Sequence, residues 1–374
     1  MDKRFSGNFY FKPLKENFLS AARFFLHTLF GVFFIFLGVY ITVSLAKNGS
    51  DFFYYAMAFA SPGTAIEFLS EEPSAEEEVP VFEAEVPEIS EETETKVYSF
   101  EIPEIKTEIP KERLGKVTET QYSAEEGGIY VSFKNAIIKN CTAHSAKEIR
   151  TKLETPHSLS LPENSPQFLI YHTHATETFE TADLGYFDTA GTWRSTDPDR
   201  NMVSVGDVLT SVLAEKGFGV VHDGTMHDDP SYQGSYQRSA VTVKNHLSEN
   251  PGITVCIDLH RDAIEPSSKE IIKPTAVING KKAAQIMIIA GCDDGTMDMP
   301  DYWENLRFAA ALADKLEELY PGICRPILFD YRKYNMDLSP GLLLIEIGAT
   351  GNTLEEAQYS AELLGNALFE LFSE

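Results

Sequence analysis

Apolar positions in the C-terminal half of the chain form two kinds of run. Short, nearly continuous apolar runs are typical of buried strands, and longer segments with apolar residues every three or four positions are typical of amphipathic helices. The strand-like runs are 167–172, 218–222, 253–260, 285–291, 324–329 and 341–346, and the helical segments are 202–216, 236–248, 302–319 and 353–372. This alternation predicts an α/β fold with a mostly parallel twisted sheet that helices cover on both faces.

The last helical segment has the clearest pattern. Apolar residues from Leu354 to Leu371 repeat on one face. Asn352 or Thr353 can cap its N-terminus, and Glu355 stands three residues after Asn352, as in a capping box. We therefore expect a long helix that packs on the sheet at the end of the chain.

A different apolar pattern lies near the start of the chain. Residues 24–46 are almost all apolar and carry no formal charge, a length that spans a bilayer at about 1.5 Å per residue. The segment is too long for the apolar region of a signal peptide, and no A-x-A cleavage site follows it. Residues 1–23 carry five Lys or Arg against two acidic residues. We expect 1–23 to be cytoplasmic, 24–46 to be a single transmembrane helix, and the rest to be extracytoplasmic.

Charge changes the picture for the segment that follows. The net charge is −26, which argues against nucleic acid as a partner. Residues 71–110 alone contain 14 Glu and two Lys, together with several prolines. Such a composition cannot bury enough apolar surface to offset the loss of chain entropy. We expect 47–125 to be an acidic, disordered linker, with partner binding as the alternative role, and 126–374 to be the folded domain, with its core at about 165–374.

Three of the predicted strands end in polar side chains that are unusual in a buried sheet. The residues are His172, His174 and Glu177 after the first strand, Asp258, His260, Arg261 and Asp262 in or after the second, and Glu346 within the third. Because binding sites in parallel sheets lie outside the carboxyl ends of the strands, we expect these side chains to meet at one edge.

Histidine and glutamate are the ligands that Zn²⁺ takes in catalytic sites, where three protein groups leave one position open for water. The metal lowers the pKa of that water to about 7. We predict a metal site with His172 or His174, Glu177 and His260 as its candidate ligands. Glu346 fits better as a separate general base and acid, since its apolar surroundings should raise its pKa.

Structural alternatives stay open for several of these residues. Asp258 can support His260 instead of binding the metal, and Glu346 can pair with a buried arginine. Arg261 and Asp262 can form an ordinary ion pair. His222 and His227, each followed by aspartate, are weaker ligand candidates.

Two further features bear on the site and its surroundings. The polar and aromatic loop 178–200 is suited to holding a substrate. The four cysteines show no CxxC spacing and favour free thiols over a disulfide framework.

Several of these stretches together resemble the stage II sporulation protein P family. The similarity runs in order through about residues 165–365 and rests on the segments YHTHATETF, RNMVSVGDVLTSVLAEKGFGVVHD, SYQGSYQRS, IDLHRDA, YPGICRPI and LLLIEIGATGNTLEEA. That family is similar in turn to the zinc-dependent N-acetylmuramoyl-L-alanine amidases. The resemblance implies an amidase-like α/β fold, His260 as a zinc ligand and Glu346 as the catalytic carboxylate.

The first segment departs from the amidase pattern, which has a glycine-rich GH turn in place of HTHATE. It leaves open whether His172 or His174 binds the metal. The amidases also supply a glutamate ligand just before their first helix, where this chain has Arg200 and Asn201, and Glu177 is the candidate to replace it. By residue type, Arg194 or Arg261 could hold substrate carboxylates or stabilise developing negative charge.

The resemblance implies a membrane-anchored peptidoglycan hydrolase that acts in engulfment during endospore formation. The implied reaction is cleavage of the amide between N-acetylmuramic acid and L-alanine, with some activity on peptide cross-links. The implied partners are the stage II sporulation proteins D and M. The implied location is the cell membrane, with the catalytic domain extracytoplasmic, in the intermembrane space between mother cell and forespore. The alternatives are a non-catalytic module that binds peptidoglycan or a partner, and another metal hydrolase such as an amidohydrolase barrel, for which about 210 residues offer too few βα units.

Overall fold

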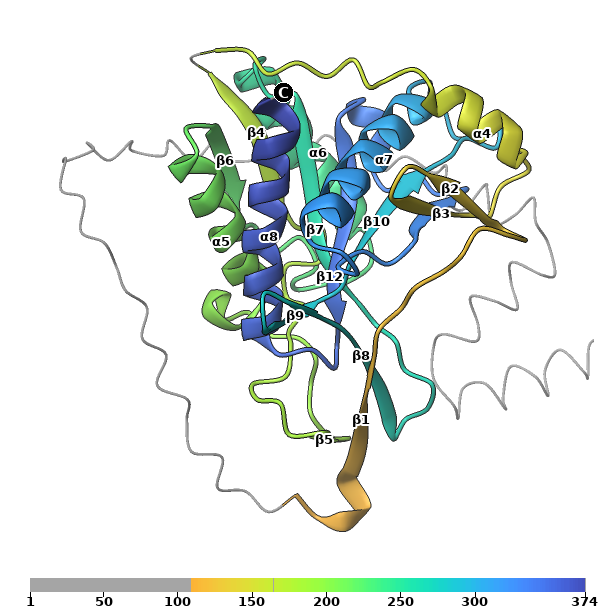
Figure 1. The fold of residues 1–374 in the computed structure, drawn as a ribbon. Coiled ribbons are helices and arrows are strands. Elements are labelled where there is room, and N and C mark those ends of the chain that lie inside the picture. Colours follow the sequence, from red (N-terminus) through yellow and green to blue (C-terminus); the bar gives the residue numbers. More distant parts are fainter. Residues whose placement is uncertain (1–108, 164, 374) are drawn as a thin grey trace, which may run out of the picture. The chain divides into compact units, whose positions relative to one another are not determined.

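The computed structural model describes residues 109–163 and 165–373. Its main sheet has eight strands (Figure 1): β2 (Tyr130–Phe133), β3 (Ala136–Asn140), β4 (Pro166–Tyr171), β6 (Gly219–Asp223), β7 (Val255–Asp262), β10 (Ile286–Gly291), β11 (Ile327–Asp330) and β12 (Leu342–Ala349). They lie in the order β2-β3-β11-β10-β12-β7-β4-β6. Five of the seven neighbouring pairs are parallel, and only β10–β12 and β2–β3 are antiparallel. The predicted mostly parallel α/β sheet is therefore confirmed.

The order of the strands also excludes one alternative for the described residues. The sheet runs from one edge strand, β2, to another, β6, and does not close on itself. An amidohydrolase barrel requires a closed ring of eight parallel strands. This open sheet is a different architecture.

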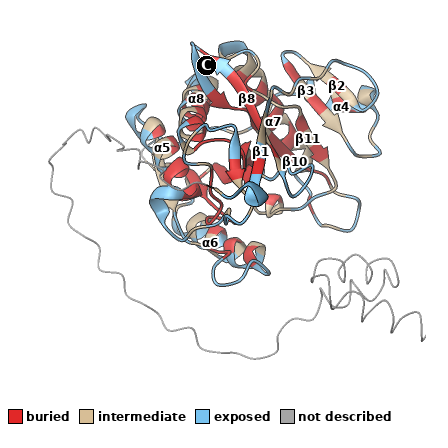
Figure 2. Ribbon diagram, turned by 90° about the horizontal axis from the view of Figure 1, so that it is seen from below, coloured by how far each residue is buried: buried red, intermediate tan, exposed pale blue. Residues whose placement is uncertain are grey.

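Helices cover both faces of the main sheet (Figures 1 and 2). The helices α5 (Met202–Glu215), α7 (Tyr302–Leu319) and α8 (Leu354–Ser373) lie on one face, and α6 (Ser235–Glu249) lies on the other. Successive residues of a strand point to opposite faces. Phe168 and Ile170 of β4 accordingly join the apolar cluster of α5, α7 and α8, and Leu169 and Tyr171 join the cluster that contains Val243 of α6.

Shorter elements lie around the main sheet. The helix α4 (Ala146–Leu153) begins at Ser145, whose side chain accepts a hydrogen bond from the Glu148 amide. Three short 3-10 helices are η1 (Lys111–Arg113), η2 (Pro198–Arg200) and η3 (Met336–Leu338). All ten predicted strand and helix ranges overlap observed elements.

A second, four-stranded sheet was not predicted. It contains β1 (Leu114–Thr120), β5 (Tyr186–Asp188), β8 (Glu270–Ile278) and β9 (Lys281–Ala284), in the order β5-β1-β8-β9. The strand β1 pairs with β8 in parallel and with β5 in antiparallel orientation. Residues 114–120, which fall within the predicted linker 47–125, thus form a strand in the described part of the chain.

The N-terminus of α8 is closed by a capping box. The Thr353 hydroxyl accepts a hydrogen bond from the Glu356 amide (3.2 Å), and the Glu356 carboxylate accepts one from the Thr353 amide (3.1 Å). Thr353 is therefore the cap, and Glu356 rather than Glu355 completes the box. Asn352 instead accepts a hydrogen bond from the Ala349 amide (2.9 Å), which closes the turn after β12.

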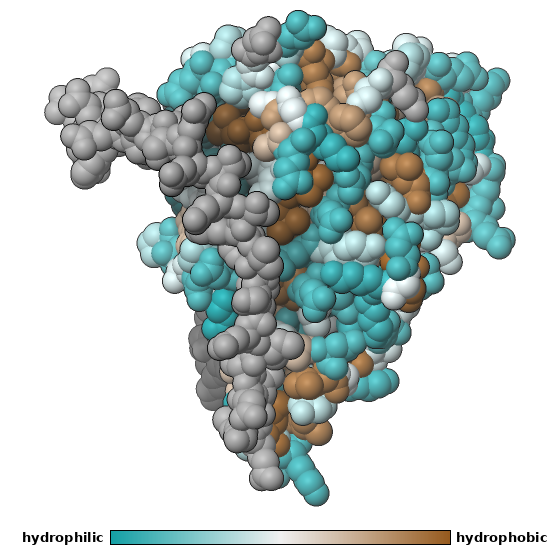
Figure 3. Space-filling model, turned by 60° about the vertical axis from the view of Figure 1, so that its left-hand side comes forward, coloured by the Kyte–Doolittle hydropathy of each residue, from teal (hydrophilic) through white to brown (hydrophobic). Residues whose placement is uncertain are grey.

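The described residues contain no helix that is long and apolar enough to cross a membrane. The predicted transmembrane segment 24–46 and most of the predicted linker lie outside them. On the face of the molecule in Figure 3, apolar side chains lie in separate patches among hydrophilic ones. All four cysteines are free thiols, and Cys256 and Cys292 are buried.

Candidate metal centre

Three adjacent parallel strands, β4, β7 and β12, bring the predicted site residues to one edge of the main sheet. His260 of β7 lies directly opposite Glu346 of β12 in the strand register. Residues in register on neighbouring strands project from the same face of a sheet. Asp258 stands two positions before His260 and shares that face. The expectation that these three strand ends converge is therefore confirmed.

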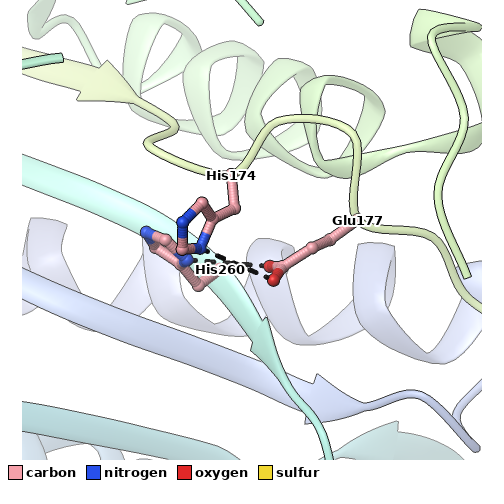
Figure 4. A group of neighbouring side chains, drawn as sticks. All are labelled: His174, Glu177 and His260. Atoms are coloured by element: carbon pink, nitrogen blue, oxygen red, sulfur yellow. Dashed lines mark ion pairs between the residues drawn. The ribbon is translucent and has the colours of Figure 1, made fainter. Parts of the chain in front are cut away.

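His174, Glu177 and His260 form a compact group at this edge (Figure 4). His174 and Glu177 lie in the segment after β4, whereas His260 lies on β7. The two rings lie next to each other, with centroids 5.0 Å apart, and the Glu177 carboxylate faces both from one side (Figure 4): its Oε1 is 3.8 Å from Nδ1 of His174, and its Oε2 is 3.6 Å from Nδ1 of His260. One ligand atom from each residue lies within 4.8 Å of the other two, and all three residues are buried.

This donor set fits a zinc ion of the catalytic type. Two imidazole nitrogens and one carboxylate are three ligands that Zn²⁺ accepts in tetrahedral geometry, with the fourth position left for water or substrate. A carboxylate contributes nothing to an apolar core, and burying it costs free energy unless it is paired or binds a metal. Among the described residues, no other group of three His, Cys, Asp or Glu side chains could hold a metal ion.

The ring nitrogens that point away from the centre are held by other side chains. Nε2 of His174 is 3.0 Å from the hydroxyl of Ser235, at the start of α6. Nε2 of His260 is 2.8 Å from Oδ1 of Asp258, a close ion pair. Such contacts fix the orientation of a metal-binding histidine and increase its basicity. They leave Nδ1 of each ring facing Glu177.

Asp258 also binds the segment that carries His174. Its Oδ1 accepts a hydrogen bond from the Thr173 amide and its Oδ2 accepts one from the Thr173 hydroxyl, each at 2.7 Å. A single buried carboxylate thus holds both the strand with His260 and the turn with His174. These contacts agree with the alternative, stated from the sequence, that Asp258 supports His260 instead of binding the metal.

The electrostatic environment gives two of the three residues the protonation states that metal ligands need. Burial alone would raise the pKa of Glu177, but His260 and Arg261 lower it to about 2. Burial and the charge of His260 lower the pKa of His174 to about 4. Burial also opposes protonation of His260, yet the carboxylates of Asp258 and Glu177 raise its pKa well above the usual value. Metal binding would therefore displace a proton from His260.

Glu346 lies beside the group without belonging to it. Its Oε2 atom is buried and has no hydrogen-bond partner in the described part of the chain. Burial raises the pKa of Glu346 to about 8. The nearby Arg325 pairs with Asp262 (2.9 Å), not with Glu346. An unpartnered carboxyl group whose pKa is near neutral can both accept and donate a proton.

The structure separates the two histidines between which the sequence could not choose. His172 points away from Glu177: its Nδ1 donates to the Leu259 carbonyl, and its Nε2 is 2.9 Å from Nε2 of His222. His222 in turn contacts Asp207 through Nδ1 at 2.9 Å. His174 is thus the histidine at the centre, and His172 and His222 form a separate pair.

His227, the other weaker candidate, is also away from the centre. Its Nδ1 donates to the His172 carbonyl and its Nε2 contacts the Thr242 hydroxyl, each at 2.8 Å. These contacts use both ring nitrogens and connect the loop before α6 to the segment after β4. Its position indicates a structural role.

Arg194 lies at the rim of the centre. Its Nη2 is 3.6 Å from Oε1 of Glu177, and its Nη1 donates to Asp228 at 2.5 Å. The side chain is still 40% exposed. It can therefore reach a bound molecule, as the substrate-binding prediction requires.

Arg261 has a different environment. Its guanidinium donates to the carbonyls of Thr178 (2.8 Å) and Trp193 (2.9 Å) and to the hydroxyl of Thr350 (3.0 Å). The side chain is buried. These contacts connect both ends of loop 178–194 to β7, so they favour a structural role over the predicted contact with substrate.

Two tyrosines at the centre were not singled out from the sequence. Tyr232 stacks on the His174 ring (centroids 4.4 Å apart), and Tyr236 meets that ring edge-on at 5.4 Å. Arg194 lies over the Tyr232 ring at 4.8 Å. The signal in the sequence was the pair of tyrosines four residues apart in SYQGSYQRS, at the start of a predicted helix.

The fold and the site define a class of protein: an open α/β sheet with a buried His–Glu–His group at the carboxyl ends of its parallel strands. A sequence model of one family, stage II sporulation protein P (SpoIIP), matches residues 71–369. The chain belongs to this family. Its similarity to stage II sporulation protein P of Bacillus subtilis (strain 168) is 31% identity over 222 residues, which cover 55% of this chain. The chain spans about half the length of that curated relative, since the match covers 50% of it.

Among solved structures, similar chains include N-acetylmuramoyl-L-alanine amidases. AmiC2 of Nostoc punctiforme matches 56% of this chain and 98% of its own, with 12% identity and a TM-score of 0.35. The CwlD amidase of Clostridioides difficile, solved in complex with the GerS lipoprotein, matches 55% of this chain and 96% of its own, with 12% identity and a TM-score of 0.33. With similarity this low, the chemistry must be argued from the residues of this chain.

Proposed function

We propose that the protein is a membrane-anchored, zinc-dependent peptidoglycan hydrolase that cleaves the amide between N-acetylmuramic acid and L-alanine. The observation that carries this proposal is the group of His174, Glu177 and His260 with Glu346 beside it at one strand edge. Membership of the sporulation family supports peptidoglycan as the substrate and engulfment as the process.

The residues of the site divide the work of hydrolysis. His174, Glu177 and His260 would hold Zn²⁺, which in such sites polarises a carbonyl and lowers the pKa of water. Glu346 takes a proton from the attacking water and passes it to the departing amine, since its pKa of about 8 permits both transfers near neutral pH. Arg194 would hold the substrate or stabilise negative charge on it, which its exposed side chain beside Glu177 supports.

The main alternative is a module that binds peptidoglycan without turnover. Glu346 disfavours it, because a buried carboxyl group without a partner reduces stability and no binding role requires that cost. A catalytic role accounts for the free Oε2 atom.

The location and partners belong to the same proposal. Segment 24–46 would anchor the chain with residues 1–23 in the cytoplasm, and the acidic linker would let the catalytic domain reach the wall between mother cell and forespore. The stage II sporulation proteins D and M are the proposed partners. Fractionation tests the anchor: the full chain should stay with membranes after an alkaline wash, and a variant without 24–46 should not.

The reaction is tested by digestion of purified murein with the detergent-solubilised full chain. The wild type should release stem peptides with free L-alanine amino termini, and Glu346→Gln and His260→Ala should each lose at least about 100-fold in rate. Glu346→Gln should keep its zinc, whereas His260→Ala should lose it, which separates the two roles.

Two outcomes would contradict this assignment. Zinc-loaded wild type that releases nothing, even with proteins D and M present, would favour the binding module. New reducing sugar ends in place of free amino termini would identify a glycosidase. Added activity on isolated cross-linked peptides would extend the reaction to cross-links.

A further inference from the structure

A depression of about 330 Å³ lies next to the metal centre, between α6 and the segment 333–338, which includes η3. Its lining includes Tyr236 and Lys244 of α6 and Lys333, Tyr334 and Asn335 of the facing segment. A volume of this size is at the lower end of the range for sites that bind small molecules or parts of larger ones.

One tyrosine separates the depression from the metal centre. The ring of Tyr236 meets the ring of His174 edge-on at 5.4 Å and stacks on the ring of Tyr334 at 5.1 Å, with an interplanar angle of 20°. An extended peptide advances about 3.3–3.6 Å per residue, so a chain whose scissile amide is at the metal centre reaches the depression about three residues later. The two sites are close enough for one substrate.

The backbone beside the depression is held in an unfavourable conformation. Tyr334 (φ 44°) and Asn335 (φ 60°) both adopt the left-handed region, which is rare for a bulky residue such as tyrosine. The Asn335 side chain donates to the carbonyl of Tyr236 (3.1 Å) and to the hydroxyl of Ser239 (3.0 Å) on α6. Strained backbone that the surroundings hold in place is concentrated at functional sites. Here it presents the Tyr334 ring to Tyr236.

The same contacts connect the depression to the metal centre. The Ser239 hydroxyl is 2.7 Å from the hydroxyl of Thr173, the residue before His174. Thr173 in turn donates to Asp258. The wall of the depression and the ligand-bearing turn therefore belong to one hydrogen-bonded network.

The depression is positively charged in a chain whose net charge is −26. Lys244 is exposed, and its ammonium group forms no hydrogen bond or ion pair with another described residue. Lys333 is 43% exposed; its Nζ pairs with Asp337 at 3.1 Å and donates to the Met297 carbonyl at 2.9 Å. Two lysines against one aspartate leave a net positive charge that favours an anionic ligand.

We propose that this depression binds the carboxylate-bearing part of the peptidoglycan stem peptide, beyond the L-alanine whose amide is cleaved; this rests on the proposed amidase function. Stem peptides carry free carboxylates on residues that follow L-alanine, and Lys244 and Lys333 are placed to receive them. The stacked rings of Tyr236 and Tyr334 offer an apolar wall to the peptide backbone. The depression thus selects acidic stem peptides over amidated ones.

Binding is measured without turnover, in the zinc-loaded full chain that carries Glu346→Gln. A soluble stem peptide with free carboxylates is titrated calorimetrically against this protein and against the same protein with Lys244→Ala and Lys333→Ala. Loss of two partly exposed charge contacts should weaken binding about three- to tenfold. Lys244→Arg with Lys333→Arg is the matched control and should keep the affinity, as should the lysine-to-alanine pair toward the fully amidated peptide.

Equal affinity of the acidic peptide for both proteins would overturn the proposal, as would equal affinity of the acidic and amidated peptides for the parent protein. Binding of a soluble wall phosphate polymer that the acidic peptide fails to displace would assign the depression to another ligand and also overturn it. Murein digestion by the wild type reports separately on the amidase function. Cleavage with an unchanged KM in the lysine-to-alanine pair would refute the depression's role alone, whereas absence of cleavage would refute the amidase.

Discussion

Asp258 shows how much of the site depends on one residue that is not a predicted ligand. It is fully buried and contacts both His260 and Thr173. Burial would raise its pKa, but His260 and the Thr173 hydrogen bonds lower it, so the carboxylate stays ionised. The ionised carboxylate thus holds β7 and the segment after β4 together, although its contact with Thr173 joins residues more than 80 positions apart in the chain.

The first prediction concerns this carboxylate. Asp258→Asn keeps the size of the side chain but removes its charge, and we expect the zinc affinity to fall by about 10- to 100-fold. Competition with a chromogenic chelator measures that affinity. Asp330→Asn, which removes a carboxylate paired with Arg332 at the surface, is the control and should bind zinc as the wild type does. Unchanged affinity in Asp258→Asn would show that His260 is oriented by its backbone alone.

The second prediction concerns Glu346 and the pH dependence of the stability of the metal-free protein. Its pKa rises from an ordinary 4.5 to about 8 on folding because of burial. Between these values the unfolded chain has lost the proton and the folded chain keeps it, so stability falls as pH rises from about 4.5 to 8. Glu346 lowers the free energy of unfolding by at most about 1.4 kcal/mol for each pH unit in this range, and this is the slope that it contributes.

Glu346→Gln removes that slope. Urea unfolding in a metal chelator at pH 5, 6.5 and 8 should show the variant gaining stability relative to the wild type at each step. The titration of groups remote from residue 346 is the same in both proteins and cancels in the difference. A difference that stays constant with pH would mean that Glu346 is ionised throughout this range.

At the scale of elements, α5 contains a glycine where helix propensity alone would favour alanine. A Cβ atom on Gly206 would lie 2.5 Å from Nε2 of His222 and 2.7 Å from Nε2 of His172. Glycine is therefore required for α5 to approach the pair of imidazole rings.

The third prediction follows from this close approach. Gly206→Ala should destabilise the protein by about 1–3 kcal/mol, as overpacking does, although the same change in an open helix usually stabilises. Ser211→Ala, at an exposed position of the same helix, is the control and should change stability little. Urea unfolding at fixed pH measures both. A more stable Gly206→Ala variant would show that the two rings can move apart without cost.

Elements with long apolar runs were predictable because burial on both faces of a parallel sheet leaves a continuous apolar signal. The second sheet was not, because its strands carry weak patterns: β1 buries only one of its seven residues, β9 reads KKAA, and β8 has Lys273 and Pro274 at its centre. The pairing of β1 with β5 and β8 joins residues at least 70 positions apart in the chain, which no local pattern records, whereas β8 and β9 form a local hairpin.

The same reasoning explains which site residues could be predicted. His174, Glu177, His260 and Glu346 all lie at or near the ends of parallel strands, and topology alone brings such ends together. Choosing between His172 and His174 required the direction of the turn after β4, which depends on the hydrogen bonds of Thr173. The position of Tyr232 and Tyr236 depends on where α6 begins, because Tyr232 precedes this helix and Tyr236 is in its first turn. The helix packs on the other face of the sheet, so no pattern within the strands indicates that its N-terminus lies at the site.

At the scale of the whole molecule, the question is where the independently folding part begins. The predicted boundary at residue 126 would remove β1, whose residues Lys116–Thr120 pair with Glu270–Pro274 of β8. It would also remove Gly115, over which the Phe187 ring lies so closely that a Cβ would be 2.2 Å from it. The strand β8 would then present an unpaired edge.

The fourth prediction compares two fragments, 109–374 and 126–374. We expect 126–374 to unfold at a temperature at least about 2–4 °C lower, since the lost pairing costs more than about 1 kcal/mol, and to aggregate through the free edge of β8. Thermal unfolding followed by circular dichroism and light scattering measures both effects. Val117→Pro within 109–374 removes the amide that donates to Gly185 (3.0 Å), so it should lower the unfolding temperature without shortening the chain. If 126–374 unfolds at the same temperature and stays monomeric, β1 is an accessory strand, and the fold that positions the metal centre is complete without it.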